Sequence, residues 1–137
     1  LNLSNLTSKA EDLTRLSFPD GSIDSLSCMH TVEHVGLGRY GDAIDPEGDV
    51  TAAKELARVV QKGGSLLFVV PIGKAKIQFN AHRIYSYDMV IDMFPGLTLK
   101  EFSLIPDNAL EKGMIYNATK EQSDKQAYGC GCFWFVK

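Results

Sequence analysis

The sequence has few of the features that mark specialised classes of protein. Only three cysteines occur among its 137 residues, and this odd number favours a reducing compartment over a disulfide framework. The longest apolar run, residues 66–71, is far shorter than the roughly 18 residues of a membrane span. No secretory signal pattern opens the chain, so we expect a cytoplasmic protein. Residue 1 is leucine, which leads us to expect a processed or truncated chain, or part of a longer product.

Basic residues are also too few for a nucleic-acid-coating surface. The chain has 14 Lys and Arg against 17 Asp and Glu, a net charge of −3, and the pI is 5.6. Hydrophobic residues make up 45% of the chain and charged residues 23%, which excludes a disordered tail, a collagen-like repeat and a coiled coil. We therefore expect one globular domain over residues 1–137, with no nucleic-acid partner.

The hydrophobic pattern predicts alternating strands and helices. A helix is expected to begin at Asp45–Pro46, an N-cap followed by a first-turn proline, and to end at Gly63–Gly64. Ser86 is expected to cap a second helix that Pro95 ends. Strands are predicted at 23–29, 65–70, 97–105 (with a bulge between Leu99 and Phe102) and 132–136, and a turn at 18–22. Residues 1–15 are expected to be weakly structured or to form a short strand or helix, and residues 71–79 an extended loop or small hairpin. Irregular chain is expected at 31–48 and 107–128.

This order predicts a three-layer α/β fold. Alternating strands and helices are typical of a mostly parallel sheet, and the strand at 65–70 is apolar on both faces, as in a sheet centre. No helix is expected between the last two strands, so we predict an antiparallel pair at one edge of the sheet.

Residues 30–34 spell H-x-x-E-H, the signature of inverted zinc proteases. That chemistry needs both histidines on one face of a helix, whereas His30 stands at the end of a predicted strand. No third ligand is evident, so we assign no metal site. The plain alternative is a polar strand-to-loop edge.

The strand end itself is a candidate site. Ligands of open α/β sheets bind outside the carboxyl ends of the strands, and Cys28, His30, Glu33, His34 and Pro71 all fall there. These residues either line a shared crevice or only form hydrogen bonds to the loop, and the sequence leaves both interpretations open.

Two irregular segments are rich in polar and aromatic side chains. They are Arg39–Asp42 and Phe79–Tyr85, and such loops are costly to order unless they bind something. Arg39 and Arg83 can hold an anionic group, or can pair with Glu33, Asp42 or Asp45 instead. Cys130 and Cys132 fall on one face of a strand, where they suit packing better than zinc binding.

The motifs of the first half of the chain resemble those of class I S-adenosylmethionine-dependent methyltransferases. Asp12-Leu13 with residues 16–24 (L-S-F-P-D-G-S-I-D) is similar to that family's run before its fourth strand. Residues 30–35 (H-T-V-E-H-V) resemble the segment after it, and 55–64 (E-L-A-R-V-V-Q-K-G-G) the next helix and turn. Residues 66–71 match the fifth strand.

A narrower resemblance covers nearly the whole chain. Residues 33–42, 79–83 and 128–132 (Y-G-C-G-C) are similar to an uncharacterised methyltransferase-like family that carries a domain-of-unknown-function label. The glycine-rich turn that holds the cofactor in class I enzymes does not occur before Asp12. The resemblance therefore implies that the chain starts near the third strand of a seven-stranded sheet.

The resemblance implies S-adenosylmethionine as cofactor and assigns roles to residues. Asp12, Leu13, Cys28, Met29 and His30 would bind the cofactor, with Asp12 accepting from the adenine amino group. His30, Glu33 or His34 would act as catalytic base. Arg39, Tyr40, Asn80, His82 and Arg83 would contact a small-molecule or glycan substrate.

The resemblance also implies an unpaired sheet edge at the 23–29 strand, which would lie beside the first strand in the family's sheet. An open apolar edge invites association, so we expect a homodimer or a covered edge. The alternative to an enzyme is a non-catalytic module with the same fold that binds a protein or carbohydrate.

Overall fold

The structure is a computed structural model that describes residues 4–137. Residues 1–3, the first of the segment expected to be weakly structured, lie outside the described residues. Residues 4–22 form turns and a single bridge between Asp12 and Arg15, as expected for irregular chain. None of the described helices is both long and apolar enough to span a membrane.

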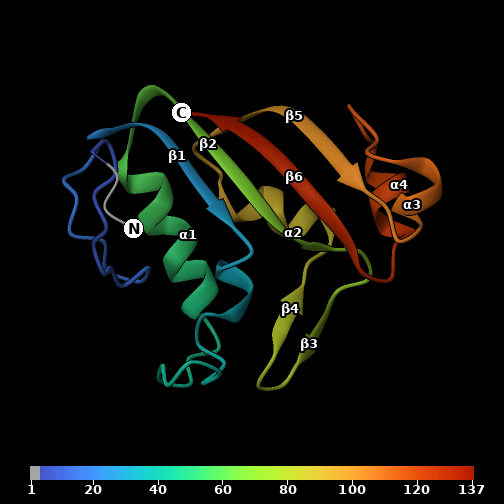
Figure 1. Ribbon diagram of the computed structural model, residues 1–137, viewed down its shortest axis with the longest axis horizontal. Helices are drawn as coiled ribbons and strands as arrows, with labels where there is room; N and C mark the ends of the chain where they lie inside the picture. Colours follow the sequence, from blue (N-terminus) through green and yellow to red (C-terminus); the bar gives the residue numbers. More distant parts are fainter. Residues whose placement is uncertain (1–3) are drawn as a thin grey trace.

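A four-stranded sheet forms the centre of the fold (Figure 1). Its spatial order is β1 (Ile23–Met29), β2 (Val60–Ile72), β6 (Gly129–Val136) and β5 (Thr98–Ile105). β1 and β2 are parallel, whereas β6 is antiparallel to both of its neighbours. Three strands thus share one direction, and the predicted antiparallel pair at one edge is confirmed. The predicted bulge is also present, as a register shift between Leu99 and Glu101.

Two helices, α1 (Gly48–Val59) and α2 (Tyr87–Met93), supply most of the helical side of the core. Alternate residues of β2 reach this core: Leu66 and Phe68 are fully buried, whereas Leu67 between them is 44% exposed. This period of two is what a sheet covered on one face requires.

The opposite face of the sheet is only partly covered. Trp134 of β6 is 43% exposed and Met29 of β1 is 62% exposed, both on the side of Leu67. Within the described part of the chain, the residues that follow the short α3 (Ala109–Lys112) flank this face, where Met114 and Tyr116 border a groove. The α/β architecture is confirmed, with the second helical layer of the predicted sandwich reduced to this segment.

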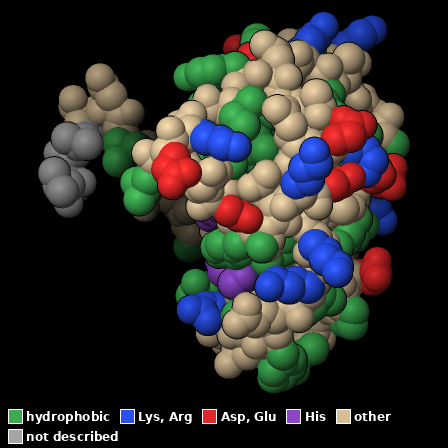
Figure 2. Space-filling view, turned by 90° about the vertical axis from the view of Figure 1, so that its right-hand side faces the viewer, with side chains coloured by type: hydrophobic (Ala, Val, Ile, Leu, Met, Phe, Trp, Pro, Cys, Tyr) green, Lys and Arg blue, Asp and Glu red, His purple; other side chains and the backbone are tan. Residues whose placement is uncertain are grey.

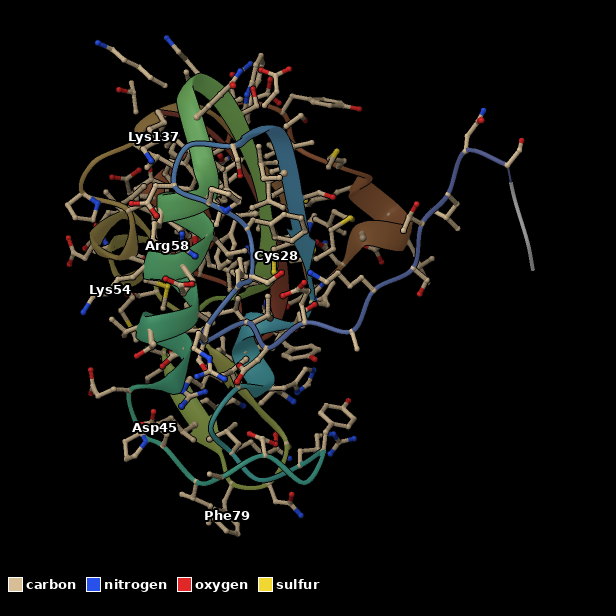
Figure 3. All side chains as sticks on the ribbon, turned by 90° about the vertical axis from the view of Figure 1, so that its left-hand side faces the viewer. Cys28, Asp45, Lys54, Arg58, Phe79 and Lys137 are labelled. Carbon is tan, nitrogen blue, oxygen red and sulfur yellow. The ribbon has the colours of Figure 1, made fainter. Side chains whose placement is uncertain are left out.

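Two segments extend beyond the carboxyl ends of β1 and β2 (Figure 1). One is the chain from the 3-10 helix at Val32–His34 to residue 47. The other is a small hairpin of β3 (Lys76–Gln78) and β4 (His82–Ile84). A small hairpin was one of the two alternatives predicted at 71–79, and the observed hairpin extends beyond that range. Figure 3 shows Phe79, at the tip of this hairpin, on the same end of the molecule as Asp45.

Helix α1 begins later and ends earlier than its sequence signals predict. Asp45 does not cap it: the side chain accepts from the amide of Glu47 in a turn, and the helix begins at Gly48. It ends at Val59 because β2 starts at Val60, before the two glycines. The Lys137 ammonium caps this end instead, since it donates to the carbonyls of Ala57 and Arg58 in α1 and of Val60, the first residue of β2 (Figure 3).

The predicted loop at 107–128 contains more structure than expected. Besides α3 it holds α4 (Lys120–Asp124), which opens with a capping box between Thr119 and Gln122. Between the helices, Ile115 forms a two-bond bridge with Leu104 of β5. β6 also begins three residues earlier than predicted, at Gly129.

Candidate functional site

Three segments far apart in the sequence meet at the carboxyl end of β1: residues 30–42, 79–83 and 128–132. His34 Nδ1 donates to the carbonyl of Ala81 across the first two, and the Arg39 guanidinium donates to the carbonyl of Asn80 at 3.1 Å. The rings of His82 and Tyr128 stand 5.2 Å apart and join the second segment to the third. The segments that carry the narrower resemblance therefore form one surface.

A cavity of about 440 Å³ opens beside this surface. Its size is in the range of small-molecule sites. Residues from the N-terminal segment form one wall and residues that follow β1 form the other. The lining residues are Glu11, Asp12, Leu13, His30, Thr31, His34, Val35, Tyr40 and Asp42.

His30 and His34 share one buried carboxylate. Glu33 is 1% exposed, and its Oε1 lies 3.1 Å from His30 Nδ1 and 3.8 Å from His34 Nε2. Since a carboxylate accepts, His30 carries its proton on Nδ1 and leaves Nε2 as the free acceptor when neutral. The three predicted catalytic residues thus form one cluster, with His30 the member placed to take a proton.

The backbone of His30 is unusual. Its φ of 49° lies in the left-handed region that residues with a Cβ rarely adopt, although its amide still donates to Val69 of β2 at 2.9 Å. Strained residues of this kind concentrate at functional sites. The conformation carries the imidazole out of the alternation of β1 and toward β6.

The N-terminal wall of the cavity is held by α1. Arg58 donates to both oxygens of Glu55 and to the carbonyl of Leu16, whose amide donates to Glu55 in turn. Figure 3 shows Arg58 on α1, facing the N-terminal chain. Hydrogen bonds from Thr14 lower the pKa of Asp12, so this exposed carboxylate is ionised at neutral pH.

The predicted cofactor residues divide between two locations. Asp12, Leu13 and His30 line the cavity. Cys28 is buried in the core under α1, and Met29 projects from the opposite face of the sheet. Neither side chain reaches the cavity, because consecutive strand residues point to opposite faces and His30 alone departs from the strand.

Of the predicted substrate residues, Tyr40 lines the cavity, whereas Arg39 and His82 lie next to its lining residues Tyr40 and His34. Tyr40 is 73% exposed, packs edge-on against His34 and lies under the Arg39 guanidinium. Burial, together with the nearby His34, lowers the pKa of His82. Figure 2 views the right-hand side of the molecule in Figure 1, and there a histidine surfaces among apolar and basic side chains.

Arg83 is a structural residue, which corrects its predicted contact with substrate. Its guanidinium is buried, lies 3.3 Å from Asp49, and donates to the carbonyls of Val35 and Pro46. The Tyr85 hydroxyl donates to the same carboxylate. The partner is Asp49 on α1 and none of the three carboxylates considered from the sequence. Arg83 thereby ties the loop before α1 to β4.

The two cysteines of β6 lie on one face of the strand, and the first reaches the cluster. Cys130 Sγ is 3.4 Å from His30 Nε2. Among the described residues, no three His, Cys, Asp or Glu side chains are placed to hold a metal ion. The two histidines of H-x-x-E-H also lack the shared helix face that a zinc protease needs, since one ends a strand and the other a 3-10 turn.

Comparison with known protein families identifies the family to which the chain belongs. The family described as Caenorhabditis protein of unknown function, DUF268, matches residues 11–127. The chain belongs to this family. The match covers the N-terminal wall, the histidine cluster and the hairpin of the DUF268 site. No curated protein matches the sequence.

Solved structures confirm that this DUF268 chain has a class I methyltransferase-like fold. A chain of the Haloferax volcanii complex between the activator Trm112 and a methyltransferase has a TM-score of 0.63 at 18% identity, over 99% of this chain. An S-adenosylmethionine-dependent methyltransferase of Thermotoga maritima has a TM-score of 0.58 at 15% identity, over 91%. The cyclase SpnF has a TM-score of 0.60 at 13% identity, over 94%.

The DUF268 chain is shorter than these structures and spans 63%, 61% and 54% of their lengths, respectively. SpnF bears the name of a cyclase, so this fold carries more than one chemistry. The comparisons thus establish the fold, and the residues of the site must carry any argument about activity.

Sequence analysis missed the part that Tyr128 and Cys130 play in this surface. The signal was the Y-G-C-G-C motif, which singled out both residues without locating them. Only the position of β6, between β2 and β5, brings Cys130 to His30 across 100 residues.

Proposed function

We propose that this chain is the acceptor-facing part of an S-adenosylmethionine-dependent methyltransferase. The observation that carries the proposal is the cavity at the end of β1. There an exposed carboxylate, Asp12, and an apolar side chain, Leu13, face a histidine cluster within a methyltransferase-like fold. An adenine ring needs an apolar wall and an acceptor for its amino group, and these two residues supply both.

The bound cofactor would supply a methyl group made electrophilic by the neighbouring sulfonium. The chain's own residues would align the acceptor and remove its proton. His30 Nε2 is the atom that would take this proton, because Nδ1 is held by Glu33. Glu33 stabilises the resulting imidazolium from its buried position, as an orienting carboxylate does.

The rim favours a polar acceptor with a flat face, such as a glycan or a small polar metabolite. Tyr40, His82 and Tyr128 present rings there, and Arg39 and Asn80 add hydrogen-bonding groups. Aromatic faces combined with a few polar groups are typical of small-molecule sites.

Calorimetric titration with S-adenosylhomocysteine tests the proposal. We expect saturable binding that Tyr40→Ala weakens several-fold, because the ring forms part of the cavity wall. Tyr116→Ala is the matched control: Tyr116 is 70% exposed, close to Tyr40 at 73%, but lies outside the cavity. Absence of binding at millimolar ligand, or equal binding by both variants, contradicts the proposal.

A non-catalytic module is the second candidate, favoured by one observation. β1 has a strand on one side only in the described structure. If the titration fails, this edge and the aromatic rim become the surface for a protein or carbohydrate partner.

A further inference from the structure

A pair of thiols lies beside the histidine cluster. Cys130 and Cys132 are both half-buried on one face of β6, and Cys130 Sγ lies 3.4 Å from His30 Nε2. Neither thiol lines the cavity of the proposed function. The cluster therefore has a second neighbour that methyl transfer does not use.

The contacts form a chain from a buried carboxylate to a thiol. Glu33 Oε1 fixes the proton of His30 on Nδ1, which leaves the Nε2 lone pair facing Cys130 Sγ, 3.4 Å away. A thiol, a base and a group that orients the base form the pattern of an activated nucleophile. Glu33 Oε2 is buried without a partner, and such an uncompensated group is retained where it has a role.

The thiols of Cys130 and Cys132 shift each other's pKa in opposite directions. A hydrogen bond from Cys130 lowers the pKa of Cys132 to about 7, and the same bond together with burial raises the pKa of Cys130. The first ionisation of the pair therefore falls on Cys132, and its lowered pKa favours the thiolate near neutral pH. The third cysteine differs: burial raises the pKa of Cys28, which sits in the core.

The pair is open to a substrate along the uncovered sheet face. Cys132 lines a groove of about 290 Å³ together with Leu67, Trp134, Met114 and Tyr116. Apolar and aromatic side chains dominate this groove, so a compact ligand can reach the Cys132 sulfur without passing through the cavity at the end of β1.

We propose that Cys130 and Cys132, with His30 as base and Glu33 as its positioning residue, form a thiol centre that exchanges with small organic disulfides. The Cys132 thiolate attacks one sulfur of the substrate disulfide. A sulfur–sulfur bond forms, the substrate bond breaks, and the departing thiolate takes a proton from water. Cys130 then gives its proton to His30 and attacks the Cys132 sulfur of the mixed disulfide, and the second substrate thiolate leaves and takes that proton from His30. The substrate gains two electrons from the cysteines, which become one disulfide, and two protons, one from solvent and one from Cys130.

The strand geometry makes the product disulfide labile. Residues two apart in a strand have Cα atoms about 6.6 Å apart, near the upper limit of about 6.8 Å for a disulfide. Closing the bond shortens the start of β6, and strained disulfides are readily reduced. The centre is therefore suited to reversible exchange, and a permanent crosslink is not expected.

The test uses the full chain, reduced and then exposed to glutathione disulfide under native conditions. Mass spectrometry after alkylation should find Cys130 joined to Cys132 and Cys28 free. Cys130→Ser should stop the reaction at a mixed disulfide on Cys132. Cys28→Ser is the matched control and should behave as the wild-type chain.

The role of His30 is measured separately by the rate of iodoacetamide alkylation against pH. We expect His30→Gln to slow the reaction of the pair by about tenfold or more near neutral pH. Glu33→Gln should have a smaller effect in the same direction. A wild-type pair that forms no internal disulfide overturns the proposal, as does a His30→Gln rate equal to wild type. The proposal stands apart from methyl transfer, because cofactor binding is not needed for either readout.

Discussion

The two carboxylate oxygens of Glu33 have unequal surroundings: Oε1 lies 3.1 Å from His30 Nδ1, whereas Oε2 is buried with no partner. A buried polar atom without a hydrogen bond costs about 1 to 3 kcal/mol. We therefore expect Glu33→Met, which keeps the volume and removes the charge, to raise the free energy of unfolding by about 1 kcal/mol. Half-exposed His30 can bond water instead.

Urea unfolding measures this effect, and exposed Glu47→Met is the control, with a change within about 0.5 kcal/mol. Loss of more than about 2 kcal/mol in Glu33→Met would show that the carboxylate holds the fold together. If Glu33→Met gains free energy of unfolding but loses thiol reactivity, Glu33 is a residue kept for function at a cost in stability.

The buried group formed by Asp49, Arg83 and Tyr85 should contribute strongly to stability. Removal of one member of a buried ion pair leaves the other charge uncompensated, so we expect Asp49→Ala to cost about 3 to 5 kcal/mol. Tyr85→Phe removes one hydrogen bond to a carboxylate that keeps Arg83, and should cost about 1 to 2 kcal/mol. Chemical denaturation separates the two, and equal costs would contradict this account.

The contact between Glu55 and Arg58 should make stability fall in acid. Hydrogen bonds from Arg58 hold the pKa of Glu55 below its ordinary value of 4.5, so the folded state favours the ionised form. The resulting stabilisation is complete above about pH 4.5 and is lost as the pH falls through the lowered folded-state pKa. Glu55→Gln should be less stable than wild type at neutral pH and should show a shallower decline in acid.

Thermal unfolding across this pH range provides the measurement. Hydrogen exchange at residues 11–18 gives a second readout, since Glu55 and Arg58 bond the Leu16 backbone. Faster exchange confined to this segment is expected in Glu55→Gln. Parallel acid profiles for the two proteins would rule out Glu55 as the source of the pH dependence.

Gly36 is required by a close backbone approach. Its φ is +77°, and a Cβ there would lie 2.0 Å from the carbonyl oxygen of Asp45. Gly36→Ala should therefore cost about 3 kcal/mol or more and loosen the loop before α1. Gly41 has a similar φ of +85° but open space around it, so Gly41→Ala measures the conformational cost alone, about 1 to 2 kcal/mol. Similar Tm losses in both variants would contradict the steric argument.

The open side of β1 should support self-association. β1 pairs only with β2 in the described chain, and unpaired strand edges bind other strands. We propose a homodimer through this edge, detectable by light scattering at micromolar concentration. Ser25→Lys, which adds a charge to each edge, should shift the protein to monomer. If the wild-type protein is a monomer at this concentration, the proposal is contradicted.

The parts of the fold that follow local rules could be predicted from the sequence. The strand at 23–29, the Ser86 cap and the slip after Leu99 depend on neighbouring residues, and the structure contains all three. Local signals misplaced α1, because the Asp45 side chain closes a turn that delays the helix to Gly48. The capping box at Thr119 was a local signal too, but it lies in a polar stretch without a hydrophobic period.

The site was only partly predictable, because its geometry depends on long-range pairing. His30, Glu33 and His34 are neighbours in sequence and their grouping was expected. Arg83 resembled a binding residue from its loop context, and only tertiary packing reveals its buried partner Asp49. The contact between Cys130 and His30 depends on the place of β6 in the sheet, which no local pattern encodes.

The position of β6 also has a consequence for the order of folding. β2 and β5 are both bonded to β6 and not to each other, so the sheet consists of two unconnected parts until residues 129–136 are inserted between them. A ribosome-bound chain that ends before this point exposes two apolar strand edges. We expect such nascent chains to depend on chaperones, and the last strand to complete the fold in one cooperative step.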